Sequence, residues 1–470
     1  MARIIKEEAY TGSSAYESKI RPLVEKWNKT KLPLVEQACN KVGIPFTTER
    51  QFALARLYEN TEQFIKGELL EATQTSDIGR YKRYAIDLIT AVVPNLTAFE
   101  NVTVEPLENK TGIVNYLKFT TGSAKGKTPL GADLASPLGL GPVDPNYTSK
   151  VISGEQLPAA TATAYESTLA WIPVMPGSVV ITHGAVTIAD DGSGVLSAST
   201  GLTGTGTIDY TTGEISYTLA ADDTSSIPVV SYKYDNERIP HKRTPQINFK
   251  IVSETLEAED RYLAAYYPLS GAFQLKKEYG VEIETLLNVQ ATAEIQREID
   301  ADIYYDIMNQ AAAGQPLVWK KTPPQGAPIS LTMHYQDFAI KLSEGAEQIH
   351  QATRRYRGNR IVCGTGVGII ISQLQGFTSA GSSASRIGAY VAGEINGMKV
   401  TVNPEFPMYE GFIGVKNDNY LEANYIYAPY MPILTTDLVT LADTSIQKGW
   451  VTSDAKKMIN PKAFIKFSIV

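Results

Sequence analysis

Hydrophobic residues recur at helical spacing in the first ninety residues and again near the middle of the chain. Apolar positions three or four residues apart are typical of amphipathic helices. The pattern predicts helices over residues 16–27, 49–70, 80–93 and 279–313. In the last of these, isoleucine, leucine or alanine occupies every fourth position. At about 1.5 Å per residue, this helix would be roughly 50 Å long.

A period of two replaces the helical pattern over residues 171–236. Turn clusters such as Thr212-Gly213-Glu214 separate the alternating runs there. Many short strands with regular turns indicate a small β-sandwich or barrel. Because Gly213 can adopt a positive φ, residues 206–215 are predicted to form a hairpin.

Two further regions complete the pattern. Residues 102–119 contain short strands, and residues 122–158 are rich in Gly, Pro, Ser and Ala, which favours an extended excursion over a core. The last third of the chain alternates between strands and helices. Its predicted helix spans 367–374, and its predicted strands span 360–363, 399–402, 412–415, 424–428 and 464–470.

Length and charge narrow the class of protein. A chain of 470 residues suggests roughly two to four domains. The net charge of −7 argues against a dedicated nucleic-acid-binding protein. A protein with a mildly acidic surface could still enclose DNA without binding it tightly. No stretch has the apolar length of a signal peptide or a membrane span. We therefore expect a soluble protein that is made in the cytoplasm and has no membrane contact.

The residues that usually carry chemistry are few and scattered. Cys39 and Cys363 are too few for a disulfide framework or a cysteine zinc cluster, and each is expected to be a small buried apolar side chain. The four histidines show no metal-ligand spacing, so each is expected at the surface or in an interface. They are His183, His241, His334 and His350.

Three segments approach known motifs without completing them. Residues 122–128 look like the end of a phosphate loop. The motif needs a glycine at position 121, where this chain has threonine, and a helix after Thr128, where Pro129 follows. We therefore interpret the segment as a flexible basic loop. Residues 364–368 have the wrong glycine spacing for a dinucleotide fingerprint and are read as a tight strand-to-helix turn. The acidic loop 190–194 lacks a full set of calcium ligands and is read as a solvated hairpin loop.

These observations predict no catalytic residues, no metal and no cofactor. A chain of this length without a convergent acid, base or nucleophile set is expected to be structural or a binding protein rather than an enzyme. The 26 tyrosines agree with this reading, because tyrosine offers a large contact area at interfaces.

Three stretches, in order, resemble the major capsid proteins of T-even-type tailed bacteriophages. They lie within residues 86–119, 252–309 and 359–433, and include VPNLTAFENVTVEP, AEIQREIDADI and EANYIYAPYMPIL. Together they cover roughly half of the chain, and the ordered set carries more information than any one piece.

The resemblance implies an α+β chain with the tailed-phage major capsid fold and an inserted small all-β domain. The implied parts are an N-terminal arm with helices at 1–100, the first part of an extended loop at 101–170, a β-sandwich-like insertion at 171–236, the return of the loop at 237–270, the spine helix of a peripheral domain at 271–319, an axial domain at 320–445 and a C-terminal peripheral-domain strand at 446–470.

The same resemblance implies a function. Hexamers, and possibly pentamers, would form the icosahedral head shell of a virion around double-stranded DNA without reading its sequence. Assembly in the host cytoplasm would involve scaffolding, portal and possible decoration proteins. For the N-terminus, removal of a propeptide and an uncut end both stay open. Two other functions also stay open: the shell protein of an encapsulin-like nanocompartment, and a carbohydrate-binding protein of the virion surface.

Overall fold

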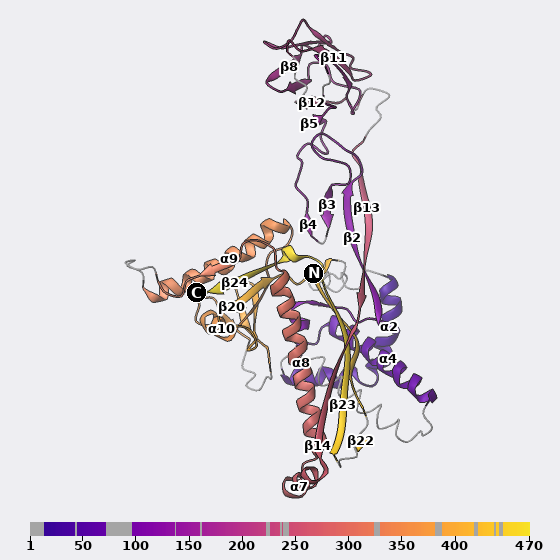
Figure 1. Ribbon diagram of the computed structural model, residues 1–470, viewed down its shortest axis with the longest axis vertical. Coiled ribbons are helices and arrows are strands. Elements are labelled where there is room, and N and C mark those ends of the chain that lie inside the picture. The colour runs from indigo at the N-terminus through magenta and orange to yellow at the C-terminus, as the bar shows by residue number, and fades with distance from the viewer. Residues whose placement is uncertain are drawn as a thin grey trace. The chain divides into compact units, whose positions relative to one another are not determined.

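The structure separates into two compact units. The computed structural model describes residues 14–42, 45–71, 96–136, 138–159, 162–221, 226–235, 237, 244–323, 330–380, 388–417, 422–436, 439–440 and 445–470. The first unit contains the chain up to residue 116, residues 138–139 and the chain from 253 onward, and the second contains 117–136 and 140–252. Each unit is described below by itself (Figure 1).

Helices open the first unit. They are α2 (Ser14–Asn28), α3 (Leu32–Val42), α4 (Thr48–Glu71) and the short α6 (Ala98–Asn101). The predicted helices at 16–27 and 49–70 are thereby confirmed, whereas the one predicted at 80–93 lies outside the described residues. Apolar side chains at helical spacing, such as Leu54, Leu57 and Tyr58 of α4, are fully buried in the main core of the unit.

A five-stranded sheet supports the long helix of the first unit. Its order is β1-β21-β23-β14, and β22 also pairs with β23. The bounds are β1 (Thr103–Val104), β14 (Glu259–Pro268), β21 (Tyr425–Thr435), β22 (Val439–Thr440) and β23 (Ser445–Met458). The long helix α8 (Ile283–Gln310) runs beside β14 and β23 (Figure 1). Its isoleucines at four-residue spacing from Ile295 to Ile307 face the core, as the sequence pattern predicts.

The long helix is shorter than predicted. It has 28 residues, which corresponds to about 42 Å rather than 50 Å. A separate helix, α7 (Leu269–Tyr279), precedes it and ends at Gly280, whose φ of 66° is left-handed. Glycine adopts this conformation without steric cost and stops the helix there. The single helix predicted from 279 is therefore wrong at its first turn.

A seven-stranded sheet forms the rest of the first unit, in the order β15-β24-β20-β16-β19-β18-β17. Its strands are β15 (Leu317–Trp319), β16 (Arg360–Cys363), β17 (Thr378–Ser379), β18 (Tyr390–Ile395), β19 (Met398–Val402), β20 (Glu410–Gly414) and β24 (Phe464–Ile469). Helices α9 (Leu331–Thr353) and α10 (Thr365–Ser372) and the 3-10 turn η3 (Pro461–Ala463) accompany it. The predicted helix and the strands predicted at 360–363, 399–402, 412–415 and 464–470 are confirmed within one or two residues. The strand predicted at 424–428 is β21 of the five-stranded sheet and continues to Thr435, seven residues further than predicted. The glycine-rich segment 364–368 is the predicted strand-to-helix turn.

The second unit is built from strands. A four-stranded sheet, in the order β13-β2-β3-β4, includes two long strands that begin or end in the first unit. Its bounds are β2 (Thr111–Thr121), β3 (Asp133–Ser136), β4 (Gly139–Leu140) and β13 (Ile247–Glu257). Short strands thus occur within the region predicted to be an extended excursion.

An eight-stranded sheet forms the remainder, in the order β5-β12-β7-β8-β9-β10-β11-β6. Its strands are β5 (Val151–Gln156), β6 (Ala164–Thr168), β7 (Val180–His183), β8 (Val186–Asp190), β9 (Val195–Ser197), β10 (Gly206–Ile208), β11 (Glu214–Thr218) and β12 (Val229–Lys233). The sheet therefore starts before residue 171. It encloses one apolar cluster that includes Trp171 and Tyr232. The predicted hairpin is present as β10 and β11, and Gly213 has a φ of 77°.

Candidate functional site

Two of the four histidines are buried, whereas the sequence predicted a surface or interface position for each. His183 is buried, and its Nδ1 lies 2.9 Å from the hydroxyl of Tyr217. His334 is also buried, stacked on Trp319 with ring centroids 4.8 Å apart. The expected surface position is wrong for both, because each ring packs against aromatic side chains of the core. His350 is exposed, and His241 lies outside the described residues.

Among the residues that the structure describes, no three His, Cys, Asp or Glu side chains gather into a set that could hold a metal ion. In the described ranges, no helix is both long enough and apolar enough to span a lipid bilayer. Cys39 and Cys363 are both buried, as predicted, and burial raises the pKa of the Cys363 thiol to about 12.

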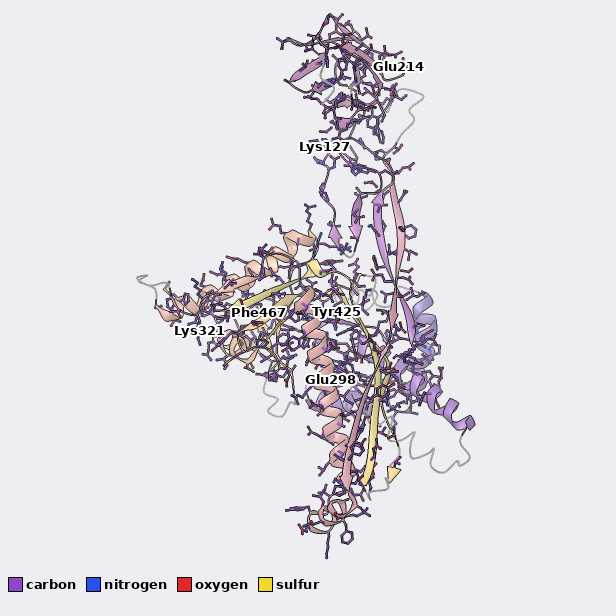
Figure 2. All side chains as sticks on the ribbon, viewed as in Figure 1. Lys127, Glu214, Glu298, Lys321, Tyr425 and Phe467 are labelled. Atoms are coloured by element: carbon purple, nitrogen blue, oxygen red, sulfur yellow. The ribbon has the colours of Figure 1, made fainter. Side chains whose placement is uncertain are left out.

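The segment that resembles a phosphate loop encloses its own lysine. Lys125 is 2% exposed, and its ammonium group donates hydrogen bonds to the carbonyls of Asn146, Tyr147 and Ser149. Burial lowers the pKa of Lys125. The flexible basic loop predicted here is therefore wrong for this residue, whereas Lys127 nearby is exposed (Figure 2).

Two aromatic rings complete the surroundings of this lysine. The Lys125 ammonium lies 5.5 Å from the ring centroid of Trp171 and 5.1 Å from that of Tyr234. The indole N–H of Trp171 donates to the carbonyl of Ala124 at 3.0 Å. Carbonyls and ring faces together compensate for the lost hydration of a buried ammonium. Lys125 therefore has a structural role in the second unit, because its ammonium group is hydrogen-bonded to three carbonyls and is not available to bind a phosphate.

The acidic loop between β8 and β9 uses its carboxylates within the protein. Asp190 accepts hydrogen bonds from the backbone N–H of Gly192 at 3.0 Å and from the hydroxyl of Tyr210 at 2.6 Å. Asp191 accepts from the backbone N–H of Ser193 at 2.8 Å, and hydrogen bonds from Ser193 lower the pKa of Asp191. The oxygens that a calcium ion would need are directed at the loop itself.

A buried polar junction surrounds α6, and we call it the α6 junction. The carboxylate of Asp300 on α8 accepts hydrogen bonds from the backbone N–H groups of Thr97 and Ala98, each at 3.2 Å. One turn further along α8, the hydroxyl of Tyr304 lies 2.5 Å from Thr97 Oγ1 and accepts from the amide of Asn101 at 2.7 Å. Burial raises the pKa of Asp300 to about 6. Ionisation of the buried Asp300 carboxylate therefore lowers the free energy of unfolding.

Charged side chains connect the α6 junction to helix α4 and to the seven-stranded sheet. Glu100 forms ion pairs with Arg50 at 2.9 Å and with Lys399 at 3.3 Å. Burial raises the pKa of Glu100, but Arg50 and Lys399 outweigh it, so the pKa lies below its ordinary value. Lys416 pairs with Glu49 of α4 at 2.8 Å. Hydrogen bonds and ion pairs at the α6 junction thus connect α4, α6, α8 and the seven-stranded sheet.

A second set of charges holds α8 against the five-stranded sheet. Arg261 of β14 contacts Glu298 at 3.0 Å and Asp302 at 2.5 Å on α8, and Asp454 of β23 at 3.0 Å. Lys456 also pairs with Asp302. Glu298 lies on α8 in Figure 2. Because Asp454 is almost fully buried, its pairing with Arg261 matters more than an exposed pair would.

The long strands β2 and β13, which we call the ribbon, expose apolar side chains that the chain itself does not cover. Ile247, Phe249 and Ile251 are 64%, 63% and 54% exposed, and every residue from 247 to 251 is exposed. Ile113 of β2 is 62% exposed. Monomeric proteins rarely leave several large apolar side chains exposed together, and such surfaces usually mark contact sites. The ribbon is therefore the strongest candidate for a contact surface, and the period-two pattern of these strands could not reveal that their apolar face is uncovered.

The sequence and the structure were compared with known proteins. A model of the family described as "Major capsid protein Gp23" matches residues 78–453, which is more than half of the chain. The chain belongs to the Gp23 family of major capsid proteins. A major capsid protein of Vibrio phage KVP40 is 22% identical over 385 residues, covering 74% of this chain and 70% of that protein.

Solved structures with a partial likeness come from phages as well. A chain of Microbacterium phage Oxtober96 has a TM-score of 0.34 and 13% identity, covering 63% of this chain and 88% of the other. The capsid of Myoviridae phage XM1 has a TM-score of 0.32 and 10% identity, covering 66% and 87%. At these TM-scores the overlays add nothing to what the family match shows.

This Gp23-family chain is a structural protein of the capsid of a tailed-phage virion, and copies of it assemble with one another. The capsid family predicted from three ordered segments is confirmed.

Proposed function

We propose that this chain forms hexameric rings, and pentameric rings as well, which tile an icosahedral head shell around double-stranded DNA. The ribbon is the observation that carries the proposal. Its residues 247–251 are all exposed, although three of them are large and apolar. Exposure of this kind is costly for a free chain and useful for a subunit, because the same contacts repeat around a closed shell.

The proposal assigns a role to each part of the chain. Residues 1–100 act as an N-terminal arm with helices, and 101–170 and 237–270 form an extended loop that includes the ribbon. The β-rich residues 171–236 are an insertion in that loop. The expected bounds are 271–319 and 446–470 for a peripheral domain and 320–445 for an axial domain at the ring centre. The sheets shift these bounds, so α8 and the five-stranded sheet, β21 included, form the peripheral domain, and the seven-stranded sheet, β15 and β24 included, forms the axial domain. The α6 junction supports this assignment, since it links α8 of the first of these domains to β19 of the second through Thr97 and Asn101.

Charge supports the proposed relation to DNA. The net charge of −7 gives the chain no general attraction for phosphates, so a shell of it would enclose DNA without binding it tightly. In this proposal, assembly takes place in the host cytoplasm with scaffolding, portal and decoration proteins. The chain has no enzymatic role, and its interactions are contacts between subunits.

Electron microscopy of the purified full-length protein tests the proposal. We expect closed shells or rings with sixfold and fivefold symmetry, either from the chain alone or together with the other head proteins of its phage. Replacing Phe249 with serine should reduce assembly, and replacing the exposed polar residue Asn248 with serine should not. A chain that stays monomeric in every combination, with or without those head proteins, would contradict the proposal.

A further inference from the structure

The eight-stranded sheet of the second unit carries charge of one sign only. Residues 151–232, which we call the sheet domain, contain eight acidic residues and no lysine or arginine. At the average frequency of the chain, a stretch of this length would contain between seven and eight basic residues. The sheet domain runs from the first residue of β5 to the last but one of β12, so the charge asymmetry follows a structural boundary. Protein surfaces ordinarily intersperse both signs, and this domain does not.

The whole net negative charge of the chain lies in the sheet domain. The domain has a formal charge of −8 with histidine neutral, whereas the rest of the chain has 43 basic and 42 acidic residues. Lysines return immediately at both ends of the domain, as Lys150 and Lys233. Val151 and Lys233 are opposite each other in the sheet, so both lysines lie where the chain enters and leaves the domain. The net charge of −7 is therefore not spread over the protein but belongs to one folded part of it.

Two of the carboxylates project from the outer face of the sheet. Glu166 of β6 and Glu214 of β11 are exposed, and Figure 2 labels Glu214 on this domain. The two strands are neighbours, and Tyr165 and Ile215, which precede and follow these glutamates along the chain, are buried in the apolar cluster. Because successive side chains of a strand point to opposite faces, both glutamates lie on the face directed away from that cluster. Their cross-strand partners are serine and threonine, so no basic side chain compensates them.

Carboxylates in the loops of the sheet domain are kept in the charged form. Hydrogen bonds from Ser193 lower the pKa of Asp191. Backbone N–H groups of Thr211 and Thr212 lower the pKa of Asp209. A hydrogen bond donated to a carboxylate favours its ionised state. These negative charges therefore persist well below neutral pH.

We propose that the sheet domain is an electrostatic repulsion surface, which keeps the sheet domains of different copies apart and leaves association to the rest of the chain. Two sheet domains brought face to face can form no ion pair, and like charges opposed across an interface disfavour contact. A net charge of one sign also keeps proteins soluble, and acidic residues do so better than basic ones.

The second unit has a particular need for such repulsion. Its strand β13 exposes the apolar side chains of Ile247, Phe249 and Ile251, which favour non-specific association of free copies. Repulsion between sheet domains acts over the screening length of the solution, whereas apolar contact acts only when surfaces touch. The charge therefore opposes random encounters before the apolar side chains meet. This role concerns any two copies of the chain and does not depend on the proposed rings or shell.

Light scattering of the unassembled full-length protein tests the inference without any substitution. The dependence of scattering on protein concentration gives the second virial coefficient, which is positive when copies repel one another. We expect a positive coefficient at about 0.01 M salt and a severalfold smaller one at about 0.15 M, because the screening length falls from about 30 Å to about 8 Å. A coefficient that does not change with salt would overturn the inference.

A matched pair of double variants assigns the repulsion to the sheet domain. Glu166→Lys with Glu214→Lys changes the formal charge of the domain to −4 and supplies the basic partners that it lacks. At low salt its second virial coefficient should fall to zero or below. Glu166→Asp with Glu214→Asp keeps both charges and should scatter like the wild type. Both positions are exposed, so the melting temperature should stay unchanged in either variant.

Two results of this comparison would contradict the inference. One is a coefficient in the lysine variant as positive as that of the wild type, and the other is an equal fall in the lysine and aspartate variants. Rings and shells play no part in these measurements. A chain that never assembles would therefore contradict the proposed function and leave the repulsive role of the sheet domain intact.

Discussion

Replacing Asp300 with asparagine removes a charge from the α6 junction and keeps the shape of the side chain. Asp300 is 3% exposed and accepts hydrogen bonds from two backbone N–H groups. Burial raises its pKa to about 6, compared with about 3.9 for an aspartate in an unfolded chain. A difference of about two pKa units corresponds to roughly 3 kcal/mol in the free energy of unfolding.

The direction of the pH dependence follows from the raised pKa. The folded chain binds the proton of Asp300 more tightly than the unfolded chain does. The stability contribution of this group is therefore fully present below about pH 4 and is lost as the pH rises through about 6. The wild type should lose roughly 3 kcal/mol from this group between pH 4 and pH 7. The Asp300→Asn variant has no such titration and should lose none of it.

Asparagine also changes the hydrogen bonds of the junction. Its single carbonyl oxygen can serve only one of the two backbone N–H groups, which costs roughly 1–2 kcal/mol. The variant should therefore be less stable than the wild type near pH 4.5 and more stable near pH 7.5, by about 1 kcal/mol in each case.

Thermal unfolding of the unassembled chain, followed by circular dichroism across this pH range, measures the effect. The difference in Tm between the variant and the wild type should change sign between pH 4.5 and pH 7.5. Asp337→Asn alters an exposed aspartate of α9 whose carboxylate accepts a hydrogen bond from the Trp319 indole N–H at 3.3 Å, and it serves as the matched control substitution. If the Asp300→Asn difference does not depend on pH, the buried charge does not destabilise the junction and the reasoning is wrong.

Three other predictions concern the interior of the two units. Lys125→Met leaves three carbonyls without their donor and should destabilise the second unit by roughly 3 kcal/mol, which is measured as faster hydrogen exchange at residues 144–149. Lys127→Met alters an exposed lysine and should leave this exchange unchanged. Equal exchange in both variants would contradict the role of Lys125. Tyr304→Phe removes a buried hydroxyl that has two partners and should lower stability by about 1–3 kcal/mol in thermal unfolding; an unchanged Tm would refute this. Gly213→Ala places a side chain at a φ of 77° and should cost about 1–2 kcal/mol in denaturant unfolding; an unchanged midpoint would contradict the need for glycine in this turn.

Local structure could be predicted well from the sequence, because periodicity and turn residues act over a few positions. The isoleucines of α8 at four-residue spacing, the hairpin at Gly213 and the strand-to-helix turn at 364–368 all lie where the pattern placed them. The start of α8 was missed, although Gly280 was visible as a residue that tolerates a left-handed φ. The ordered capsid-like segments also identified the family without any knowledge of the fold.

Which polar groups become buried was not predictable in the same way. Lys125 and His183 look like ordinary surface residues in the sequence, and each becomes buried because segments far apart in the chain fold over it. Lys125 meets Trp171 and Tyr234, and His183 meets Tyr217. The burial of Asp300 depends likewise on Thr97, more than two hundred positions earlier in the chain.

The sequence by itself determined the helices, most strands and the membership of a capsid family. Only the tertiary structure decided which apolar faces the chain covers and which it leaves open. The isoleucines of α8 from Ile295 to Ile307 and the apolar residues of β13 from Ile247 to Ile251 follow equally regular patterns, yet the former are buried and the latter exposed. The physical reason is that periodicity reports which side of an element is apolar, whereas burial depends on what packs against that side. In a shell subunit that partner can be another molecule, and no pattern within one chain records it.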